Sequence, residues 1–392
     1  MISVLHLTTS LGLAGAEMSL ARLVCHMDRS RFRNTVVSMT DAEILPSQLE
    51  SAGVRFYSLG MSKGMPDPSA AVRLLRTVRK VRPQVLQTWM YHADLLGLLV
   101  GKWARVPAIV WNVQCSSIAA PRNRWLSKLV LRSLAALSPY PDVVLTNSHA
   151  GQKYHETIGY KPREWQWFPN PLDLDQFRPD PEARASLRAE LGLAPDARLI
   201  GLIARFHPMK DHANFIAAAK MLADLGADLH FVLAGYYIDR DNATLREAIE
   251  ATGISERFHL LGLRQDLSRI DAALDIACSA SAYGEGASNA VGEAMACGVP
   301  CVVTDVGDSA FLVAQTGKAV PPRDSEAFAL ACRSILNLPT EERLQLGMEA
   351  RKRIAGLCDL PSVVTRYENL YERLALASRK YESRAVPATL QQ

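Results

Sequence analysis

Residues 275–305 read DIACSASAYGEGASNAVGEAMACGVPCVVTD, and the order of residue types in this stretch defines one unit of structure. The apolar run DIACSAS predicts a strand, and AVGEAMAC predicts a helix that Ser288 or Asn289 can cap. Gly298 suits the position just after a helix end, and Pro300 stops the helix before the second apolar run, PCVVTD. The stretch therefore predicts a strand, a helix and a further strand in succession.

The same alternation runs through the whole chain. Apolar runs such as SVLHLTT (3–9) and PQVLQTW (83–89) alternate with amphipathic stretches until about residue 170, and the pattern restarts at RLIGLIA (198–204). The segment between, FPNPLDLDQFRPDPEA (168–183), is rich in Pro and Asp and predicts a linker. Strand–helix repetition of this kind predicts a parallel, doubly wound sheet, here formed twice.

The predicted organisation is therefore two Rossmann-like domains of similar size that face a central cleft. Ligands of such sheets bind at the carboxyl ends of the strands, which predicts a site in that cleft. A last amphipathic helix, roughly from Ser362 to Ala377, is expected to cross back towards the first domain. The predicted segments are 1–175, 176–361 and 362–392.

Composition narrows the class of protein. The chain has 392 residues, of which 48% are hydrophobic, and this suits a globular enzyme of two domains. It contains no run of 18 apolar residues, and MISVLHLTTS suits a first strand better than a signal peptide. Its seven cysteines form no CxxC pair and no zinc spacing, which favours a reducing compartment and a cytoplasmic protein.

Charge is distributed unevenly along the chain. Residues 1–180 hold 21 Lys+Arg and 13 Asp+Glu, a net +8, whereas the remainder holds 23 and 27, a net −4. In RNRWLSKLVLRSL (122–134), Arg124, Lys128 and Arg132 recur every fourth residue beside apolar side chains. This helix suits either contact with anionic lipid or packing on a core with a solvated face. We expect peripheral contact with an anionic membrane, at the cytoplasmic face of the inner membrane, and no nucleic acid partner.

Two carboxylates stand eight residues apart, Glu285 in the loop that follows a predicted strand and Glu293 in the next helix. The backbone amides of 286–289 lie at that helix N-terminus, which favours an anion such as a diphosphate. In GLIARFHPMKDH (201–212), Arg205 and Lys210 follow another predicted strand and also suit a diphosphate. These residues predict a site where cations and amides hold phosphate and glutamates hold sugar hydroxyls.

EGASNAVGEAMACGVPCVVTDVGD, with GLIARFHPMK and FPNPLDLDQF before it, resembles the donor-binding half of the retaining glycosyltransferases of family 4, which have the GT-B fold. The resemblance implies that Glu285 contacts the transferred sugar, that Glu293 holds the ribose, and that Arg205 and Lys210 neutralise the diphosphate. It also implies a nucleobase against the main chain of GLRQD (262–266). The donor-binding residues so implied in this half are Arg205, Lys210, Leu263, Arg264, Glu285, Gly286, Ala287, Ser288, Asn289 and Glu293.

The likeness is weaker in the first half. SLGLAGAE (10–17) places Gly15 where the family usually has a Gly-Gly pair, and WMYHAD (89–94) places His92 after a strand, at a level where relatives often carry a histidine. Gln114 and Cys115 stand where many relatives have a histidine. Ala14 replaces the first glycine of the pair, which leaves Gly15 as the donor-binding amide that faces phosphate. Ala287 and Phe311 also depart from the family pattern and, with Gln114 and Cys115, imply an altered sugar pocket or weak activity.

The resemblance implies retaining transfer of a hexose from a nucleotide sugar, most commonly a UDP-sugar. The net +8 of residues 1–180 favours a lipid-linked or surface saccharide as the acceptor. Arg205, Lys210, Glu285 and His92 are the expected catalytic residues, with His92 assisting at most, and no metal or other cofactor is expected. A GT-B nucleotide-sugar epimerase or a non-enzymatic saccharide-binding subunit remains an alternative. A nicotinamide oxidoreductase fits poorly, because GLAGAE lacks the GxGxxG spacing.

Overall fold

The computed structural model describes residues 1–12, 15–41, 45–62, 67–116, 124–224 and 228–385, with side chains throughout except at 124–127 and 378–385. The chain divides into two compact units. The first comprises Met1–Gln114, Ala120–Pro171 and Leu360–Gln392, and the second Cys115–Ala119 and Leu172–Asp359. The sequence predicts boundaries at 175/176 and 361/362. In the structure, the contacts divide the chain at 171/172 and 359/360.

The first unit is built on a parallel seven-stranded sheet of order β3-β2-β1-β4-β5-β6-β7. Its strands are β1 (Ile2–Thr8), β2 (Phe32–Thr40), β3 (Arg55–Met61), β4 (Val85–Trp89), β5 (Ala108–Val113), β6 (Val143–Thr146) and β7 (Trp165–Trp167). Both faces of this sheet are covered, so apolar residues follow one another along each strand. In β1, Val4 packs on one face and its neighbour Leu5 on the other.

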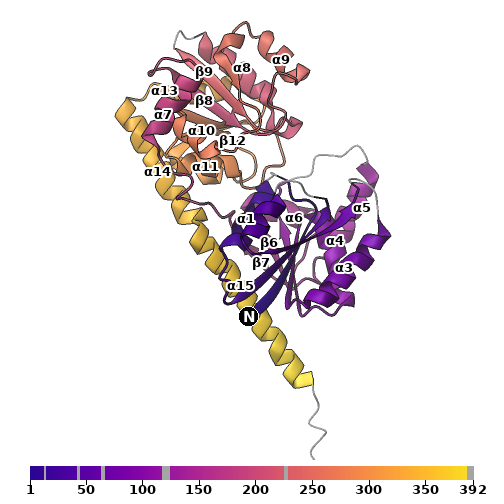
Figure 1. Cartoon of the computed structure of the whole chain (residues 1–392). Coiled ribbons are helices and arrows are strands. Elements are labelled where there is room, and N and C mark those ends of the chain that lie inside the picture. Colours follow the sequence, from indigo (N-terminus) through magenta and orange to yellow (C-terminus); the bar gives the residue numbers. More distant parts are fainter. Residues whose placement is uncertain (13–14, 42–44, 63–66, 117–123, 225–227, 386–392) are drawn as a thin grey trace, which may run out of the picture. The chain divides into compact units, whose positions relative to one another are not determined.

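Among the described residues of the first unit, six helices follow its strands in turn and one more comes from the end of the chain. They are α1 (Gly15–His26), α2 (Leu45–Ser51), α3 (Pro68–Val81), α4 (Tyr91–Trp103), α5 (Arg124–Leu137), α6 (His149–Thr157) and α15 (Leu360–Ala385). Helices α3, α4 and α5 lie side by side on one face of the sheet, and α1 and α15 cover the other (Figure 1).

Helix α15 completes the core of the first unit. Its apolar stripe includes Tyr367 and Tyr371, which are buried against β1, β4 and β5. Both phenols have polar partners inside that core: Tyr371 donates to Gln87 Oε1 at 2.6 Å, and Asn112 Nδ2 donates to the Tyr367 hydroxyl at 3.2 Å. The C-terminal helix is thus fixed to the first unit by burial and by satisfied hydrogen bonds.

The second unit repeats this plan with a parallel six-stranded sheet of order β10-β9-β8-β11-β12-β13. Its strands are β8 (Arg198–Ile203), β9 (Leu229–Ala234), β10 (Phe258–Leu260), β11 (Ile276–Ser279), β12 (Cys301–Thr304) and β13 (Gly317–Val320). Its helical elements are α7 (Pro181–Glu190), η1 (Pro208–Lys210), α8 (His212–Ala223), α9 (Ala243–Glu250), η2 (Ser255–Arg257), α10 (Leu267–Ala273), α11 (Asn289–Ala296), α12 (Ser309–Val313), η3 (Ala314–Thr316), α13 (Ser325–Leu336) and α14 (Thr340–Cys358).

The stretch 275–305 folds as its sequence predicts. It forms β11, the short helix α11 and β12, and the two strands pair in parallel. Ser288 occupies the N-cap position of α11, although its side chain makes no capping hydrogen bond. Gly298, just past the helix end, has a φ of 75°, the left-handed conformation that favours glycine there.

Candidate active site

The carboxyl ends of β8 and β11 bring Lys210 and Glu285 together. These two strands are neighbours in the sheet, so the loops that follow them meet at one edge. Lys210, at the end of η1, donates through Nζ to Glu285 Oε2 at 2.6 Å. Ser281 donates its hydroxyl to the same oxygen at 2.8 Å. Glu285 is only 8% exposed, so this edge contains a partly buried, charge-assisted cluster.

Backbone contacts fix the loop that carries Glu285. The amide of Ala282 donates to the carbonyl of Met209 at 2.8 Å, which ties this loop to η1 and therefore to Lys210. The amide of Asp308 donates to the carbonyl of Gly286 at 2.8 Å. At Gly307, φ is 64° and a Cβ atom would lie 2.1 Å from the carbonyl oxygen of Glu285. Only glycine allows the chain after β12 to pass this closely behind the site.

Charge balance at the cluster favours an ionised glutamate. Burial alone would raise the pKa of Glu285, but the charge and hydrogen bond of Lys210, the hydrogen bond of Ser281 and the charge of Arg205 together hold that pKa below its ordinary value. Arg205 lies two residues after the end of β8 and is exposed. Burial, Arg205 and Lys210 lower the pKa of the adjacent His207. The edge is thus cationic around one carboxylate and suits an anionic ligand.

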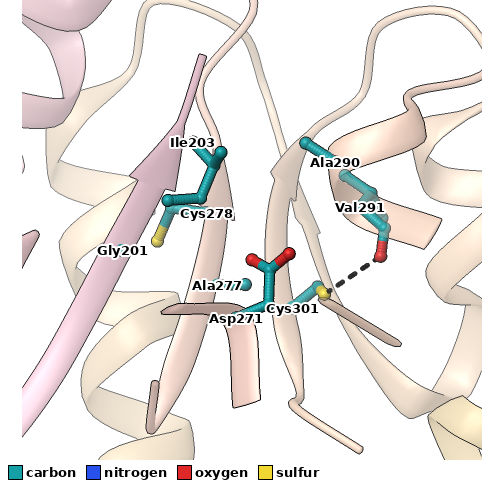
Figure 2. A pocket seen from close by; sticks show the side chains of 8 residues that line it. All are labelled: Gly201, Ile203, Asp271, Ala277, Cys278, Ala290, Val291 and Cys301. Carbon is teal, nitrogen blue, oxygen red and sulfur yellow. Dashed lines mark hydrogen bonds between the residues drawn. The ribbon is translucent and has the colours of Figure 1, made fainter. Parts of the chain in front are cut away.

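Glu293 lies in the interior turn of α11 and is 7% exposed. Behind this helix, Asp271 of α10 lines a cavity of about 10 Å³, which has room for about one water molecule. Figure 2 shows the Asp271 carboxyl within this cavity, beside Val291 and Cys301. Neither oxygen of Asp271 has a hydrogen-bond partner among the residues that the structure describes. Burial raises the pKa of Asp271 well above its ordinary value, and the charge of Glu293 raises it further, so both effects favour the neutral form of this carboxyl.

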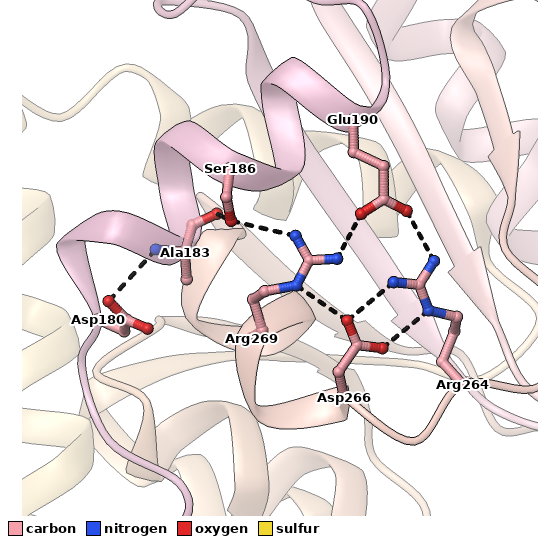
Figure 3. Close-up of polar contacts among 7 residues, drawn as sticks. All are labelled: Asp180, Ala183, Ser186, Glu190, Arg264, Asp266 and Arg269. Carbon is pink, nitrogen blue, oxygen red and sulfur yellow. Dashed lines mark hydrogen bonds and ion pairs between the residues drawn. The ribbon is translucent and has the colours of Figure 1, made fainter.

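Leu263 and Arg264 follow β10. Leu263 is 51% exposed, as a residue beside a ligand can be, whereas the Arg264 side chain is engaged in ion pairs. Arg264 donates to Glu190 at 2.7 Å and, through two nitrogens, to Asp266 at 2.8 Å. Arg269 contacts the same two carboxylates and completes the ring of charges in Figure 3. These contacts attach the loop after β10 to α7 and leave its main chain as the part that could contact a ligand.

Sequence reasoning misses a pair of tyrosines at the same edge. Tyr236 and Tyr237 follow β9, are 55% and 59% exposed, and contact each other with ring centroids 4.2 Å apart. Tyr237 has a φ of 60°, which is rare for an aromatic residue and is found where surrounding structure imposes it. The amide of Phe206 donates to the carbonyl of Tyr236 at 2.8 Å, so the pair adjoins the loop of Arg205. In the sequence, two tyrosines after a predicted strand do not by themselves indicate a ligand site. They indicate one only when the structure shows that both are exposed at the carboxyl edge of the sheet.

In the first unit, Gly15 and His92 lie at one edge of the sheet. Gly15 begins α1 after β1, His92 is the second residue of α4 after β4, and the last residues of these strands, Thr8 and Trp89, are register partners. Both Gly15 and His92 are exposed. Gln114 and Cys115 are half-buried after β5, and Ala14 lies outside the described residues. No side chains of the described ranges form a group of three or more His, Cys, Asp or Glu that could hold a metal ion, and metal-independent chemistry stays a prediction.

Both halves of the chain match models of glycosyltransferase families. Residues 13–176 match the model described as Glycosyltransferase Family 4, and residues 197–338 match the model described as Glycosyl transferases group 1. With two Rossmann-like units and these two matches, the chain is a glycosyltransferase with the GT-B fold. The fold class predicted from the sequence is therefore confirmed.

Among curated relatives, EpsF of Bacillus subtilis, which is named as a glycosyltransferase, is 25% identical over 380 residues, 92% of this chain and 97% of the relative. The UDP-Gal:alpha-D-GlcNAc-diphosphoundecaprenol alpha-1,3-galactosyltransferase of Escherichia coli is 24% identical over 251 residues, 63% of this chain and 64% of the relative. Among solved structures, Anabaena HepE in complex with UDP and glucose has a TM-score of 0.83 and 20% identity, covering 95% of this chain and 100% of that chain.

Proposed function

We propose that this chain transfers a hexose from a UDP-sugar to a lipid-linked or surface saccharide acceptor, with retention of the anomeric configuration. The observation that carries the proposal is the cluster of Lys210, Glu285 and Ser281 beside Arg205, at the carboxyl edge of the second sheet. The names of relatives support the substrate class: HepE is solved with UDP and glucose, and the Escherichia coli relative is named for a UDP-galactose donor.

In this proposal each residue at the edge has one role. Arg205 and Lys210 receive the diphosphate, aided by the amides of 286–289, while Glu285 accepts hydrogen bonds from the transferred sugar and Glu293 from the ribose. Leu263 and the main chain of Arg264 face the nucleobase, and Tyr236 offers it an aromatic surface. In the first unit, the amide of Gly15 faces phosphate and His92 stands near the acceptor.

The transfer breaks the bond between the anomeric carbon and the distal phosphate oxygen and forms a bond from that carbon to an acceptor hydroxyl oxygen. The leaving diphosphate takes the electron pair and then the acceptor proton, on the face from which it departs. Arg205 and Lys210 stabilise the charge that develops on the leaving oxygen, and losing one such preorganised donor typically costs about 2.7–4 kcal/mol. His92 assists the proton transfer at most.

The acceptor and location are proposed from charge and from relatives. The net +8 of residues 1–180 favours a partner that carries anionic phosphate, and the Escherichia coli relative is named for a diphosphoundecaprenol substrate. No helix in the described part of the chain is both long and apolar enough to cross a bilayer. From the basic first half and the name of that relative, we propose a cytoplasmic enzyme in peripheral contact with the cytoplasmic face of the inner membrane.

Calorimetry with UDP, GDP and a panel of their sugars tests the donor. Heat is expected with UDP and one or more UDP-sugars, and the Glu293→Ala variant should bind less tightly while keeping its melting temperature within a few degrees. Zero heat across the panel for well-folded protein contradicts the proposal. An epimerase would convert the donor sugar without acceptor, whereas a transferase releases UDP in stoichiometric amounts only when acceptor is present.

A further inference from the structure

The outer face of α3, α4 and α5 carries many cations and no exposed carboxylate. From Pro68 to Pro141 the sequence contains eleven Lys and Arg residues and a single acidic residue, Asp94. Asp94 is fully buried and accepts a hydrogen bond from Thr88 at 2.5 Å, so it contributes nothing to the surface. A stretch of this length with one sign of exposed charge is a strong electrostatic feature.

The three helices pack side by side in one layer, with α4 between α3 and α5 (Figure 1). Their inner sides are buried on the sheet, so the exposed side chains form the outer face of the layer. Eight exposed cations lie on these helices or just after them: Arg76, Arg79, Lys80, Arg82, Lys102, Arg105, Lys128 and Arg132. None of the eight forms an ion pair with any side chain that the structure describes. We call this the basic helical face.

Large apolar side chains are exposed among these cations. Trp103 is 65% exposed, Leu99 is 57% exposed one turn before it on α4, and Leu129 of α5 is 54% exposed. On α4 these residues share one stripe with Lys102, and on α5 Leu129 shares a face with Arg132, three residues further on. Cations near helix ends also stabilise helices, but that effect does not account for exposed leucine and tryptophan on the same face.

We infer that the basic helical face is a docking surface for an anionic lipid bilayer. Helices with a cationic face and exposed Trp and Leu lie in the plane of the membrane interface, where tryptophan is enriched and anionic headgroups attract Lys and Arg. A nucleic acid would match the charge but would leave Leu99, Trp103 and Leu129 without an apolar environment. The inference deepens the proposed function, because this face would bring the enzyme to a lipid-linked acceptor.

Flotation of the full chain with vesicles tests the inference without any sugar donor. The chain is expected to float with phosphatidylcholine vesicles that contain phosphatidylglycerol at low salt, to float much less at high salt, and to stay in the bottom fraction with phosphatidylcholine alone. Lys102→Glu with Lys128→Glu should lower the partition coefficient roughly tenfold or more, since each cation near an anionic surface contributes roughly fivefold. The matched control is Lys318→Glu with Lys352→Glu, two exposed lysines of the second unit, which should float like the parent chain.

A second variant separates lipid from other polyanions. Leu99→Ser with Trp103→Ser keeps the charge and should also lower flotation, and thermal melts verify that each variant is folded. Absence of flotation at low salt, equal loss in the control pair, or unchanged flotation of the serine variant each overturns the inference. UDP binding is measured in a separate experiment. If the chain does not float with vesicles, the sugar-transfer proposal is unaffected, and if the chain does not bind UDP, the flotation result still tests the membrane contact.

Discussion

The two units share one sheet topology but differ at the surfaces that the topology exposes. The first six strands of the first sheet and all six of the second follow the same order, 3-2-1-4-5-6, counted within each unit. At the carboxyl edge of the second sheet, Lys210 and Glu285 form a partly buried ion pair, whereas Gly15 and His92 at the first are exposed. The first unit instead concentrates cations on its helices. The fold thus supplies the edge of each sheet, while a few loop residues supply the chemistry at that edge.

Removing one catalytic candidate from each edge tests the difference between the two edges most directly. Lys210→Ala is expected to lower kcat by roughly 10²–10³-fold, because a preorganised donor to the leaving group is lost. His92→Ala should lower kcat by less than the roughly 10²-fold that a general base typically supplies. Single-turnover UDP release with acceptor present measures both. Equal losses would mean that His92 contributes as much to catalysis as Lys210, which would contradict its assisting role.

Gly307→Ala tests whether the chain after β12 fixes the loop of Glu285. The new Cβ would lie 2.1 Å from a carbonyl oxygen, so the backbone must shift, and we expect the free energy of unfolding to fall by about 1–3 kcal/mol with a large loss of UDP affinity. The matched control is Gly356→Ala in α14, where nothing lies within 4 Å of the added atom. Chemical denaturation and calorimetry measure the two effects, and an unaltered UDP affinity would show that this packing does not control the site.

Tyr236→Ala sharpens the assignment of the nucleobase to the second unit. Stacking of a base on an aromatic side chain is worth about 1–3 kcal/mol, so the Kd for UDP should rise by a matching factor while the melting temperature stays unchanged. Tyr140→Ala is the control, since Tyr140 of the first unit is similarly exposed at 53%. If neither variant changes the Kd, the tyrosine pair is no part of the donor site.

Periodic features of the sequence predicted the two sheets and α11, because strand and helix patterns are local. The sequence predicted only that Lys210 and Glu285 follow strands of the same sheet and lie at one edge of it. Their 2.6 Å contact depends on loop contacts such as that between Ala282 and Met209, which no local pattern encodes. The same limit applies to Arg264. Its partner Glu190 is 74 residues away, so the sequence could not predict this ion pair, and the contact of the main chain of 262–266 with a nucleobase stays a prediction.

Each of the two units contains a buried histidine that should make the free energy of unfolding fall as the pH decreases. His155 of the first unit and His212 of the second each have a pKa of about 4, chiefly because burial disfavours the charged ring. The unfolded chain, with histidine near 6.5, binds more protons between pH 6.5 and 4, so stability falls as pH decreases through that range. The slope is up to about 1.4 kcal/mol per pH unit for each such histidine.

His155→Gln should remove one such contribution from the first unit. Urea denaturation at several pH values between 6.5 and 4 should then show a shallower decline in the free energy of unfolding for the variant than for the parent chain. The slope, rather than the absolute stability, is the readout, because the variant also loses the hydrogen bond of His155 to Tyr91. An identical slope would mean that His155 is protonated equally in both states.

The smallest expected effect concerns the ring of charges in Figure 3, where Arg264 contacts Glu190 and Asp266. Arg264 and Glu190 keep 25% and 37% of their side-chain surface exposed, so solvent screens the pair and a double-mutant cycle should give a coupling below about 1 kcal/mol. Because only the main chain is proposed to face the nucleobase, Arg264→Ala should weaken UDP binding less than Tyr236→Ala does. A larger loss, with Glu190→Ala leaving the Kd unchanged, would show that the guanidinium itself leaves the ring of charges to contact the donor.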